Sequence, residues 1–294
     1  IIKYYYNTLY IYIMNIDKIT FIKDDNLAKK FVIIIVLILI FILLMYIGTS
    51  MIIYLNSPKK NPYLIKGMIS GSRQKTILQD PKKKGSITIL RSVNEDGGLE
   101  FTWGVWLYVN SPIDDNSRFK GFKHIFHKGN ITRIYNDDDK KGIFMPNNAP
   151  GLYFKYNRND ESYSADDKTL SLYVYMNTYK RILEEVVINE IPIEKWFHIA
   201  IRVKQKVMDV FINGQIIKRK IFSSIPKQNY DNVHIAKNGG FDGNISDLRY
   251  FNSALSGSNI LTIINNGPDL RSNNKKRAMD YYPPYFSLNW FFNN

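Results

Sequence analysis

The chain has 294 residues, of which 45% are hydrophobic and 14% are aromatic, and it contains no cysteine. This apolar content is too high for a disordered chain, and it predicts one packed domain of ordinary size together with extra segments. The lack of cysteine excludes disulfides and thiolate metal sites. The net charge of +14 makes both nucleic acids and acidic surfaces partners to consider.

The positive charge is concentrated in the flanking segments. Residues 101–270 include 22 basic and 18 acidic side chains, so little of the excess falls on the part that we expect to fold. A face that reads DNA would carry its basic residues on the folded domain. We therefore expect no nucleic-acid partner, and the flanking charge is better suited to anionic lipid or another acidic surface.

Residues 1–30 form an N-terminal segment that precedes a long apolar run. The chain begins with Ile1, and Met14 is its first methionine. We hypothesise that translation starts at Met14 and that residues 1–13 are not part of the native protein. Detection of peptides from residues 1–13 by mass spectrometry would reject this hypothesis.

Residues 31–55 are the uninterrupted apolar run, FVIIIVLILIFILLMYIGTSMIIYL. At about 1.5 Å per residue, the run is long enough to span a bilayer with some tilt. A buried core helix of this length would normally have a polar face, and the apolar part of a cleaved signal peptide is usually about 7–15 residues long. The run therefore predicts an uncleaved, single-pass transmembrane helix. Lysines lie on both sides, so the orientation stays open.

Residues 56–85 are basic and polar. They include three prolines and the run Lys82-Lys83-Lys84. Proline and charge of this kind are typical of linkers, so we predict a membrane-proximal stalk. The folded domain is then expected to begin at residue 86, with a first strand over residues 86–91 (SITILR).

From Phe101 onward the hydrophobic period is two, as in β-strands. The stretch FTWGVWLYV places Trp103 on the same face as Phe101 and Val105. The clearest turn is Asn213-Gly214, because both residues readily adopt the positive φ angles of a two-residue hairpin. Further strands are predicted over residues 124–127, 151–156, 171–176, 184–188, 196–203, 207–212, 215–221, 232–235 and 244–251. Short strands at this spacing predict an all-β fold of two antiparallel sheets packed face to face.

A single helix is predicted after the strands, over residues 256–265. Ser256 or Ser258 provides its N-cap, and Gly267-Pro268 ends it. Residues 271–294 form a basic and aromatic tail that ends YYPPYFSLNWFFNN. Two roles for this tail stay open: packing on a sheet edge, or contact with lipid.

Three stretches occur in order: FTWGVWLYV, EKWFHIAIRVKQKVMDVFINGQII and GGFDGNISDLRYFNSALS. Together they resemble the laminin-G-like and pentraxin-like domains of the concanavalin A-like lectin and glucanase superfamily. The resemblance covers residues 101–266 and implies a jelly-roll sandwich, which we place at residues 86–270. The residues on family positions that we expect to hold the fold together are Trp103, Trp196, His198, Asn213, Gly214, Phe241, Gly243, Asp247, Arg249 and Leu255.

The closing stretch also carries a prediction about its backbone. Gly243 allows a close approach or a bulge where a side chain would clash. Ile245, Leu248 and Tyr250 cannot share one face under strict alternation. We therefore expect either a β-bulge or a strand that is buried on both faces.

The carboxylates do not match a glycosidase pattern. Glucanases of the superfamily usually carry E-x-D-x-E on one strand, and this chain has no such triplet. Glu184, Glu185 and Glu190 are instead predicted to be exposed charges. Because glycoside hydrolysis needs two carboxylates at a defined separation, the sequence favours binding without catalysis.

Metal sites have little support. His124 and His127 have opposite parity on a strand and are expected to point to opposite faces, which makes a poor ligand pair. The family resemblance implies calcium on a rim loop, for which Asp137, Asp138 and Asp139 are the candidate ligands. Lysines at 140 and 141 weaken that site, and no other cofactor is expected.

These features predict a single-pass membrane-anchored module that recognises a glycan or a protein partner through the loops of its sandwich. The composition is rich in Ile, Asn, Lys and Tyr, which suggests an AT-rich genome, and we hypothesise a virion or host-cell membrane of a large DNA virus. Two alternatives stay open. The chain could be an assembly protein that tethers a membrane to a protein shell, or a degenerate glycoside hydrolase.

Overall fold

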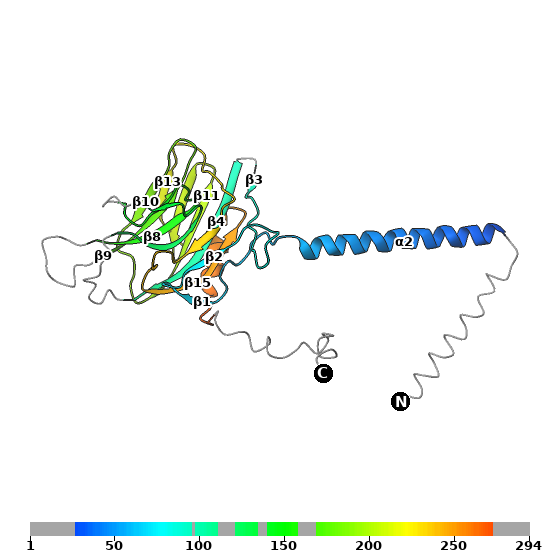
Figure 1. Ribbon diagram of the computed structural model, residues 1–294, viewed down its shortest axis with the longest axis horizontal. Helices are drawn as coiled ribbons and strands as arrows, with labels where there is room; N and C mark the ends of the chain where they lie inside the picture. Colours follow the sequence, from blue (N-terminus) through cyan, green and yellow to red (C-terminus); the bar gives the residue numbers. More distant parts are fainter. Residues whose placement is uncertain (1–26, 96–97, 111–120, 135–139, 158–168, 273–294) are drawn as a thin grey trace, which may run out of the picture. The chain divides into compact units, whose positions relative to one another are not determined.

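The computed structural model describes residues 27–95, 98–110, 121–134, 140–157 and 169–272. The chain divides into two compact units, one up to Ser57 and one from Pro58. The first unit contains the helix α2 (Leu27–Asn56), and the second contains a two-layered β-sandwich (Figure 1).

The helix α2 is apolar on all sides. Its large hydrophobic side chains from Phe31 to Leu55 are exposed, apart from the partly exposed Ile33, and the hydroxyl of Thr49 donates within the helix to the carbonyl of Met45 at 2.9 Å. The segment Lys29–Leu55 is long and apolar enough to cross a membrane, although a signal sequence near the N-terminus would meet the same two criteria. The predicted run of residues 31–55 falls inside this helix.

The sandwich consists of two sheets. Sheet A has the spatial order β1 (Met68–Ser70), β15 (Gly243–Phe251), β4 (Gly98–Val109), β11 (Trp196–Lys204), β12 (Val207–Ile212) and β13 (Gln215–Ile221), and β3 (Val93–Glu95) also pairs with β4. Sheet B has the order β10 (Glu184–Ile188), β9 (Thr169–Met176), β8 (Gly151–Asn157), β5 (Lys123–Lys128), β14 (Val233–Ile235) and β2 (Lys75–Ile77). The strands β6 (Arg133–Ile134) and β7 (Phe144–Met145) form a small separate ladder. The predicted all-β sandwich of antiparallel sheets is confirmed.

The core lies between the two sheets, where their inward-facing side chains meet. Trp103 of β4 stacks on Phe126 of β5 with 5.4 Å between ring centroids, and it meets the edge of Tyr250 on β15 at 5.1 Å. All three side chains are buried. Aromatic residues of this size bury large apolar areas, so this cluster joins the two sheets at their centre.

Local signals in the sequence located most elements. The strands predicted from residue 124 onward agree with the structure to within two residues. Asn213 and Gly214 adopt φ angles of 47° and 84°, as the two-residue hairpin requires. The register shifts between Ser246 and Arg249, which confirms the predicted bulge in the closing strand.

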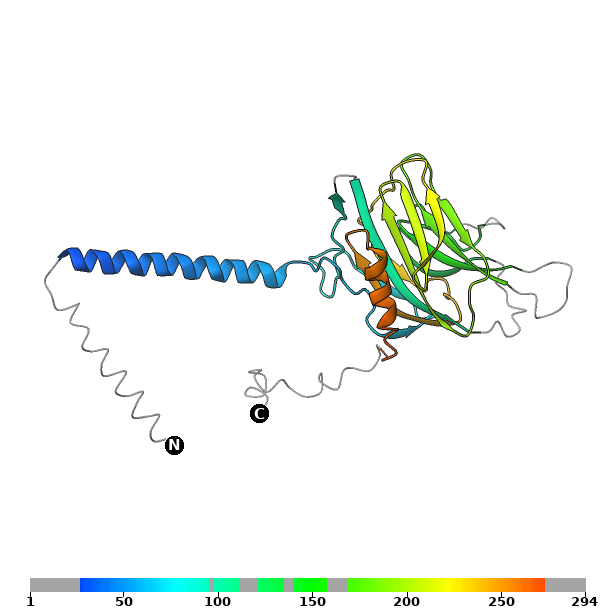
Figure 2. The ribbon, with the colours of Figure 1, turned by 180° about the vertical axis from the view of Figure 1, so that it is seen from behind.

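The helix α3 (Gly257–Asn265) lies on the outer face of sheet A, where Figure 2 shows it in orange beside β4. The hydroxyl of Ser256 accepts from the backbone N–H of Asn259, so Ser256 is the N-cap. Ile260 is buried against Phe211 of β12. A Cβ atom at Gly214 would lie 2.8 Å from Leu261 Cδ2, so the hairpin turn packs closely against this helix, and the φ of 84° favours glycine at that position.

The segment predicted as a stalk belongs to the folded unit, which begins at Pro58. Leu64 and Ile65 are each 1% exposed, and the strand β1 pairs with β15 while β2 pairs with β14. The prediction of a stalk over residues 56–85 is therefore corrected. Its apolar stretches are only two or three residues long, and they become strands because distant partners complete their hydrogen bonding.

The first strand was also placed incorrectly. Residues 86–91 are not a strand; the chain there is held by Gln79, whose amide nitrogen donates to the carbonyl of Ile87 at 2.9 Å. The backbone N–H of Ile89 donates to the side-chain oxygen of Gln79, also at 2.9 Å. One glutamine side chain thus replaces the partner strand that these backbone groups would otherwise need.

Candidate functional site

The outward face of sheet B is covered by aromatic and titratable side chains, whereas its inner face is apolar. One row across strands β5, β8, β9 and β10 consists of His124, Tyr153, Tyr173 and Val187. The next row consists of His127, Gly151, Tyr175 and Glu185. Because side chains alternate along each strand, the inner face receives Leu152, Phe154, Leu172 and Val174.

The accessible part of this face lies around Lys155, Tyr173 and Glu185, and the buried side chains of Phe122 and Tyr175 support it from below. We call these five residues the Tyr173 face. The rings of Phe122 and Tyr173 meet edge to face with 4.8 Å between centroids. The ammonium of Lys155 lies 5.1 Å from the centroid of the Phe122 ring. The hydroxyl of Tyr175 donates to Glu185 at 2.9 Å.

The Tyr173 face combines a neutral tyrosine ring with one positively charged and one negatively charged side chain. Burial, and then the carboxylate of Glu185, raise the pKa of Tyr173 above its ordinary value, so its phenol stays protonated near neutral pH. Tyr173 is half-buried and Glu185 is exposed. The arrangement thus offers the partly exposed Tyr173 ring with its hydroxyl, an ammonium and a carboxylate on a rigid sheet.

The sequence analysis did not identify this face, although the sequence of β8 and β9 contains a signal for it. In the stretches YFKY from Tyr153 and YVY from Tyr173, the outward residues alternate with apolar residues that face the core, such as Phe154 and Val174. Attention to the outward positions of these strands would have found a row of tyrosines. Their accessibility, by contrast, depends on which side chains cover the sheet, and this requires the tertiary structure.

The histidine prediction was wrong. A register shift between His124 and Phe126 places an extra residue in β5, so that Ile125 and Phe126 both join the core. His124 and His127 consequently lie on the same outward face, with 2.7 Å between His124 Nε2 and His127 Nδ1. Simple parity fails here because the strand does not alternate regularly.

The three clustered histidines are buried, and a hydrogen bond joins two of them, His124 and His127. The backbone N–H of Lys237 donates to His124 Nδ1 at 2.9 Å, so His124 carries its proton on Nε2 and donates to His127. His127 Nε2 then donates to the carbonyl of Asn130 at 3.3 Å. The ring of His234 stacks on His127 with 5.1 Å between centroids.

Burial determines the protonation of these histidines. It lowers the pKa of His127 to about 3 and the pKa of His234 to about 4, and it holds the pKa of His124 well below its ordinary value. They are therefore neutral at pH 7. Within the described residues, no group of three His, Asp or Glu side chains could hold a metal ion.

The calcium candidates Asp137, Asp138 and Asp139 lie outside the described residues, as do residues 1–26 and 273–294.

The family residues of the hairpin lie within sheet A. Trp196 is half-buried, and its ring lies 5.6 Å from that of Tyr108. His198 is buried, and burial lowers its pKa to about 4. The side-chain oxygen of Asn213 accepts from the backbone N–H of His198 at 2.9 Å, which ties the turn to β11.

The family residues of the closing strand fasten neighbouring segments. Phe241 packs against Phe154, with 5.1 Å between ring centroids. Asp247 has a φ of 49° at the bulge, and its carboxylate accepts from the backbone N–H of Gly67 at 3.1 Å and of Asp269 at 3.0 Å. Burial is the main reason why the pKa of Asp247 is raised.

Arg249 contacts the segment that precedes β1. Its guanidinium lies 4.4 Å from the centroid of the Tyr63 ring and donates to the carbonyl of Asn61 at 3.3 Å. The region predicted as a stalk is thus docked on the closing strand through two residues of the family motif, Asp247 and Arg249.

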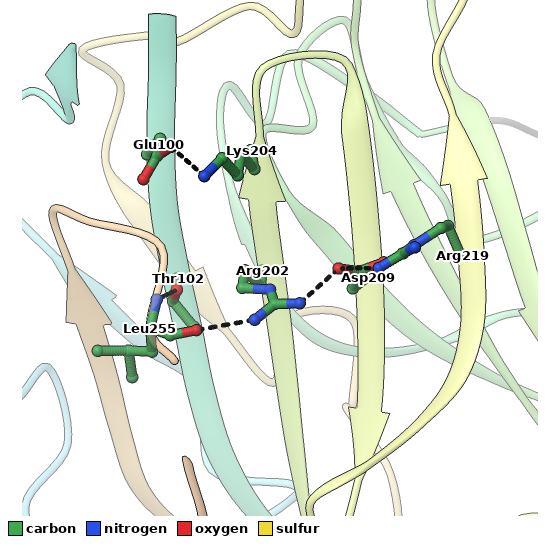
Figure 3. A network of polar contacts seen from close by, with 7 residues as sticks. All are labelled: Glu100, Thr102, Arg202, Lys204, Asp209, Arg219 and Leu255. Atoms are coloured by element: carbon green, nitrogen blue, oxygen red, sulfur yellow. Dashed lines mark hydrogen bonds and ion pairs between the residues drawn. The ribbon is translucent and has the colours of Figure 1, made fainter. Parts of the chain in front are cut away.

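Leu255 belongs to a polar network on the outer face of sheet A (Figure 3). Its backbone N–H donates to Thr102 Oγ1 at 2.9 Å, and its carbonyl accepts from Arg202 at 3.0 Å. Arg202 also donates to Asp209 at 2.8 Å, and Arg219 donates to the same carboxylate at 2.6 Å. The network fixes the loop that leads into α3.

Removing the carboxylate of Asp209 should destabilise the sandwich. Burial acts to raise the pKa of Asp209, but the bonds from Arg219 and Arg202 outweigh it and lower the pKa. We expect Asp209→Asn to reduce the free energy of unfolding by about 1–3 kcal/mol, because charged hydrogen bonds to a buried carboxylate are lost. Thermal denaturation followed by tryptophan fluorescence measures this change.

Glu100→Gln is the matched control for Asp209→Asn. Glu100 is also buried, but the cation that it pairs with is the largely exposed Lys204, at 3.3 Å on the same face. Its loss should therefore cost less than the loss of the Asp209 carboxylate, about 1 kcal/mol. Equal effects of the two substitutions would contradict the role assigned to Asp209.

Two antiparallel sheets with an aromatic outward face define a lectin-like jelly-roll sandwich. The sequence profile of the Concanavalin A-like lectin/glucanases superfamily matches residues 82–261, and the chain belongs to this family. No curated protein matches the chain in sequence.

Several solved structures are similar in fold. The receptor binding domain of botulinum neurotoxin C/D mosaic serotype is 13% identical, with a TM-score of 0.39 over 57% of this chain and 36% of that chain. The binding domain of botulinum neurotoxin DC in complex with SialylT is 15% identical, with a TM-score of 0.36 over 57% and 35%.

A heptameric SAP-like pentraxin from Limulus polyphemus is 14% identical, with a TM-score of 0.36 over 63% of this chain and 76% of the pentraxin. The chain thus spans about a third of the two toxin domains and most of the pentraxin. At these identities the likeness describes the fold alone.

Proposed function

We propose that this protein is a single-pass membrane-anchored, non-catalytic binding module that recognises a glycan through the Tyr173 face. The observation that carries the proposal is the half-buried Tyr173 ring, which lies on a rigid strand beside a carboxylate and near an ammonium. Binding sites commonly combine an apolar or aromatic surface with a few fixed polar groups. The sequence analysis assigned recognition to the loops, whereas this face belongs to the strands of sheet B.

The chemistry of the Tyr173 face suits a sugar. The apolar face of a pyranose ring stacks on an aromatic side chain, and its hydroxyls need both donors and acceptors nearby. Glu185 accepts and Lys155 donates, and the charge on each strengthens the bonds it makes. The strands hold these groups in place before the ligand arrives, which lowers the entropic cost of binding.

Membrane anchoring through α2 is supported by the apolar character of this helix. All backbone groups within a helix find partners inside it, so an apolar helix of this length is stable in the hydrocarbon core of a bilayer. Resistance of the full chain to alkaline extraction from membranes would be the expected result. Quantitative release into the soluble fraction would reject the anchor.

The roles of the carboxylates favour binding over hydrolysis. Glu184 is buried and accepts from the backbone N–H of Ser223 at 2.9 Å, from the Ser223 hydroxyl and from Thr178 at 3.2 Å. Burial acts to raise the pKa of Glu184, but these donors outweigh it and lower the pKa. A glycosidase acid needs the opposite shift, so Glu184 is suited to holding loops together.

A glycan array probed with the full chain in detergent tests the proposed function. We expect specific binding that Tyr173→Ala weakens at least tenfold, because the stacking surface is lost. Tyr230→Ala removes a tyrosine that is 87% exposed and lies outside the Tyr173 face, so it should leave binding unchanged. Absence of any sugar signal, together with stoichiometric co-purification of a coat protein, would favour the assembly alternative instead.

A further inference from the structure

A second surface lies at the end of the sandwich where β4 begins, which we call the Gly98 end. The strands β11 and β15 run antiparallel to β4, so they end where β4 begins. Lys204, the last residue of β11, pairs with Glu100, and Phe251, the last residue of β15, pairs with Thr102. Two loops meet at this end, residues 177–183 and residues 222–227. With the end of β13 they present a set of side chains that we call the basic rim: Tyr179, Lys180, Arg181, Ile182, Ile221, Ile225 and Lys227.

The apolar side chains of the basic rim lack protein cover. Tyr179 is 71% exposed, Ile182 is 59% exposed, Ile221 is 70% exposed and Ile225 is 49% exposed. Single exposed apolar residues are normal on protein surfaces, but a group of this kind on adjoining loops usually marks an interaction site.

The basic rim is held rigidly. Thr178 and Pro226 form a bridge between the two loops, and the backbone N–H of Tyr179 donates to the carbonyl of Ile225 at 3.2 Å. The buried carboxylate of Glu184 accepts from both loops, through Thr178 and Ser223. The exposed isoleucines are therefore presented by a fixed backbone, and docking would order little additional chain.

The charge of the basic rim is positive. Lys180 and Arg181 are exposed beside Ile182, and the ammonium of Lys227 lies 5.5 Å from the centroid of the Tyr179 ring. The carboxylate of Glu184, which lies between these loops, is buried under its donors. At the opposite end of the sandwich, the described loops carry exposed Glu190, Glu194 and Asp242.

Chain connectivity relates the Gly98 end to the apolar helix. The side chain of Asn61 accepts from the backbone N–H of Asn252, just after the end of β15. Only residues 57–60 separate Asn61 from the last residue of α2. Within the sandwich unit, Asn61 is thus held at the same end as the basic rim.

We propose that the basic rim docks on the anionic surface of the lipid bilayer that holds α2, and this proposal rests on the anchoring in the proposed function. Ile182, Ile221 and Ile225 enter the boundary between headgroups and acyl chains, while Lys180, Arg181 and Lys227 contact lipid phosphates. Aliphatic tips combined with basic side chains are typical of surfaces that bind membrane interfaces. Isoleucine offers nothing to sugar hydroxyls, so this surface differs in kind from the Tyr173 face.

Single-cysteine reporters test the docking, since the chain has no native cysteine. The full chain carrying Ile182→Cys or Lys195→Cys is labelled with an environment-sensitive fluorophore and placed in nanodiscs of phosphatidylcholine, with or without phosphatidylserine. Lys195 is exposed at the opposite end of the sandwich and is the matched control. We expect phosphatidylserine to shift the emission of the label at residue 182 to the blue and to shield it from an aqueous quencher, with no change at residue 195.

Charge reversal separates docking from folding. Lys180→Glu, Arg181→Glu and Lys227→Glu, combined in the Ile182→Cys chain, change side chains outside the core and should leave the melting temperature within a few degrees. Each cation near an anionic membrane contributes about fivefold to binding, so the triple substitution should weaken docking roughly a hundredfold. High salt should weaken it in the same way.

Several outcomes would overturn the docking proposal. Equal quenching of the two labelled positions with phosphatidylserine would reject contact with the bilayer, and shielding that persists after charge reversal would reject recognition of anionic lipid. Shielding that requires a second copy of the chain or an added protein would assign the rim to that partner. If the chain does not elute with the nanodiscs, the anchor itself is wrong and docking falls with it; elution without shielding rejects docking alone.

Discussion

Acidification from pH 7 to pH 5 should lower the free energy of unfolding of the sandwich by about 4 kcal/mol through His124 and His127 alone. Both side chains are buried and neutral in the folded protein, with the pKa of His127 at about 3 and that of His124 well below its ordinary value. In the unfolded chain each would titrate near 6.5. The unfolded state therefore takes up protons over this range while the folded state does not.

The sign of the effect follows from the lowered folded-state pKa. Each histidine contributes its full stability above pH 6.5, and the contribution decreases as the pH falls toward the folded-state value. At pH 5 the loss is about 2 kcal/mol for each histidine. The charged groups nearest to the cluster are Lys128, Lys237 and Asp231, and the two lysines further oppose protonation.

Thermal denaturation at pH 7 and at pH 5 measures the acid effect on the full chain in detergent. For a domain of this size, 1 kcal/mol corresponds to about 2–4 °C, so the melting temperature should fall by at least about 8 °C. The variant His124→Gln removes one titrating group and should show a smaller difference between the two pH values, whatever its stability at pH 7. A melting temperature that is the same at both pH values would contradict the neutral buried cluster.

The second large effect is expected at Gly243, the first residue of the closing strand. Its φ is 151°, and a Cβ atom there would lie 2.0 Å from the carbonyl oxygen of Tyr108 and 2.8 Å from the ring of Phe241. Neither the backbone of β4 nor the buried ring can move without disturbing the core. Gly243→Ala should therefore reduce the free energy of unfolding by about 2–5 kcal/mol, through overpacking and backbone strain together.

Substitutions at two other glycines separate the effect of steric overlap from the effect of backbone strain. Gly239 has a φ of 83° with nothing within 4 Å of the added Cβ, so Gly239→Ala tests conformational strain alone. Gly257 has open space and no positive φ, so Gly257→Ala should be nearly neutral or slightly stabilising. Melting temperatures should rank in the order Gly257→Ala, Gly239→Ala and Gly243→Ala, from highest to lowest. A Gly243→Ala variant as stable as Gly239→Ala would show that β15 tolerates a side chain at this approach.

Much of the fold could be predicted from sequence because its signals are local. The alternation around Trp103, the Asn213-Gly214 turn and the serine before α3 each act through neighbouring backbone geometry, and each appears in the structure as expected. The bulge near Asp247 was predictable because Ile245, Leu248 and Tyr250 all reach the core and strict alternation does not allow this.

Other features depend on partners that are distant in sequence. The residues around Gly67 resemble a linker, and they become part of the sandwich because Asp247, 180 positions later, accepts the Gly67 N–H and β15 offers an edge for pairing. The contact between His124 and His127 depends on one extra residue in β5, which alternation by itself does not reveal. Neither of these contacts can be recognised from a short stretch of sequence.

The candidate sites could likewise be predicted only in part from the sequence. The tyrosines of β8 and β9 are visible as alternating residues, but the position of Lys155 over Phe122 and the bond from Tyr175 to Glu185 arise only when four strands align. The basic rim likewise joins two loops about forty residues apart through Glu184, a residue that looked like an exposed charge.

By itself, the sequence determined an apolar helix of membrane-spanning length, the two-residue period of the strands and a family motif at the closing strand, because side-chain pattern and turn stereochemistry act over a few residues. Only the tertiary structure decided where the folded unit begins, which histidines meet and which tyrosines stay accessible. These outcomes depend on register and burial, which are set by the packing of segments far apart in the chain.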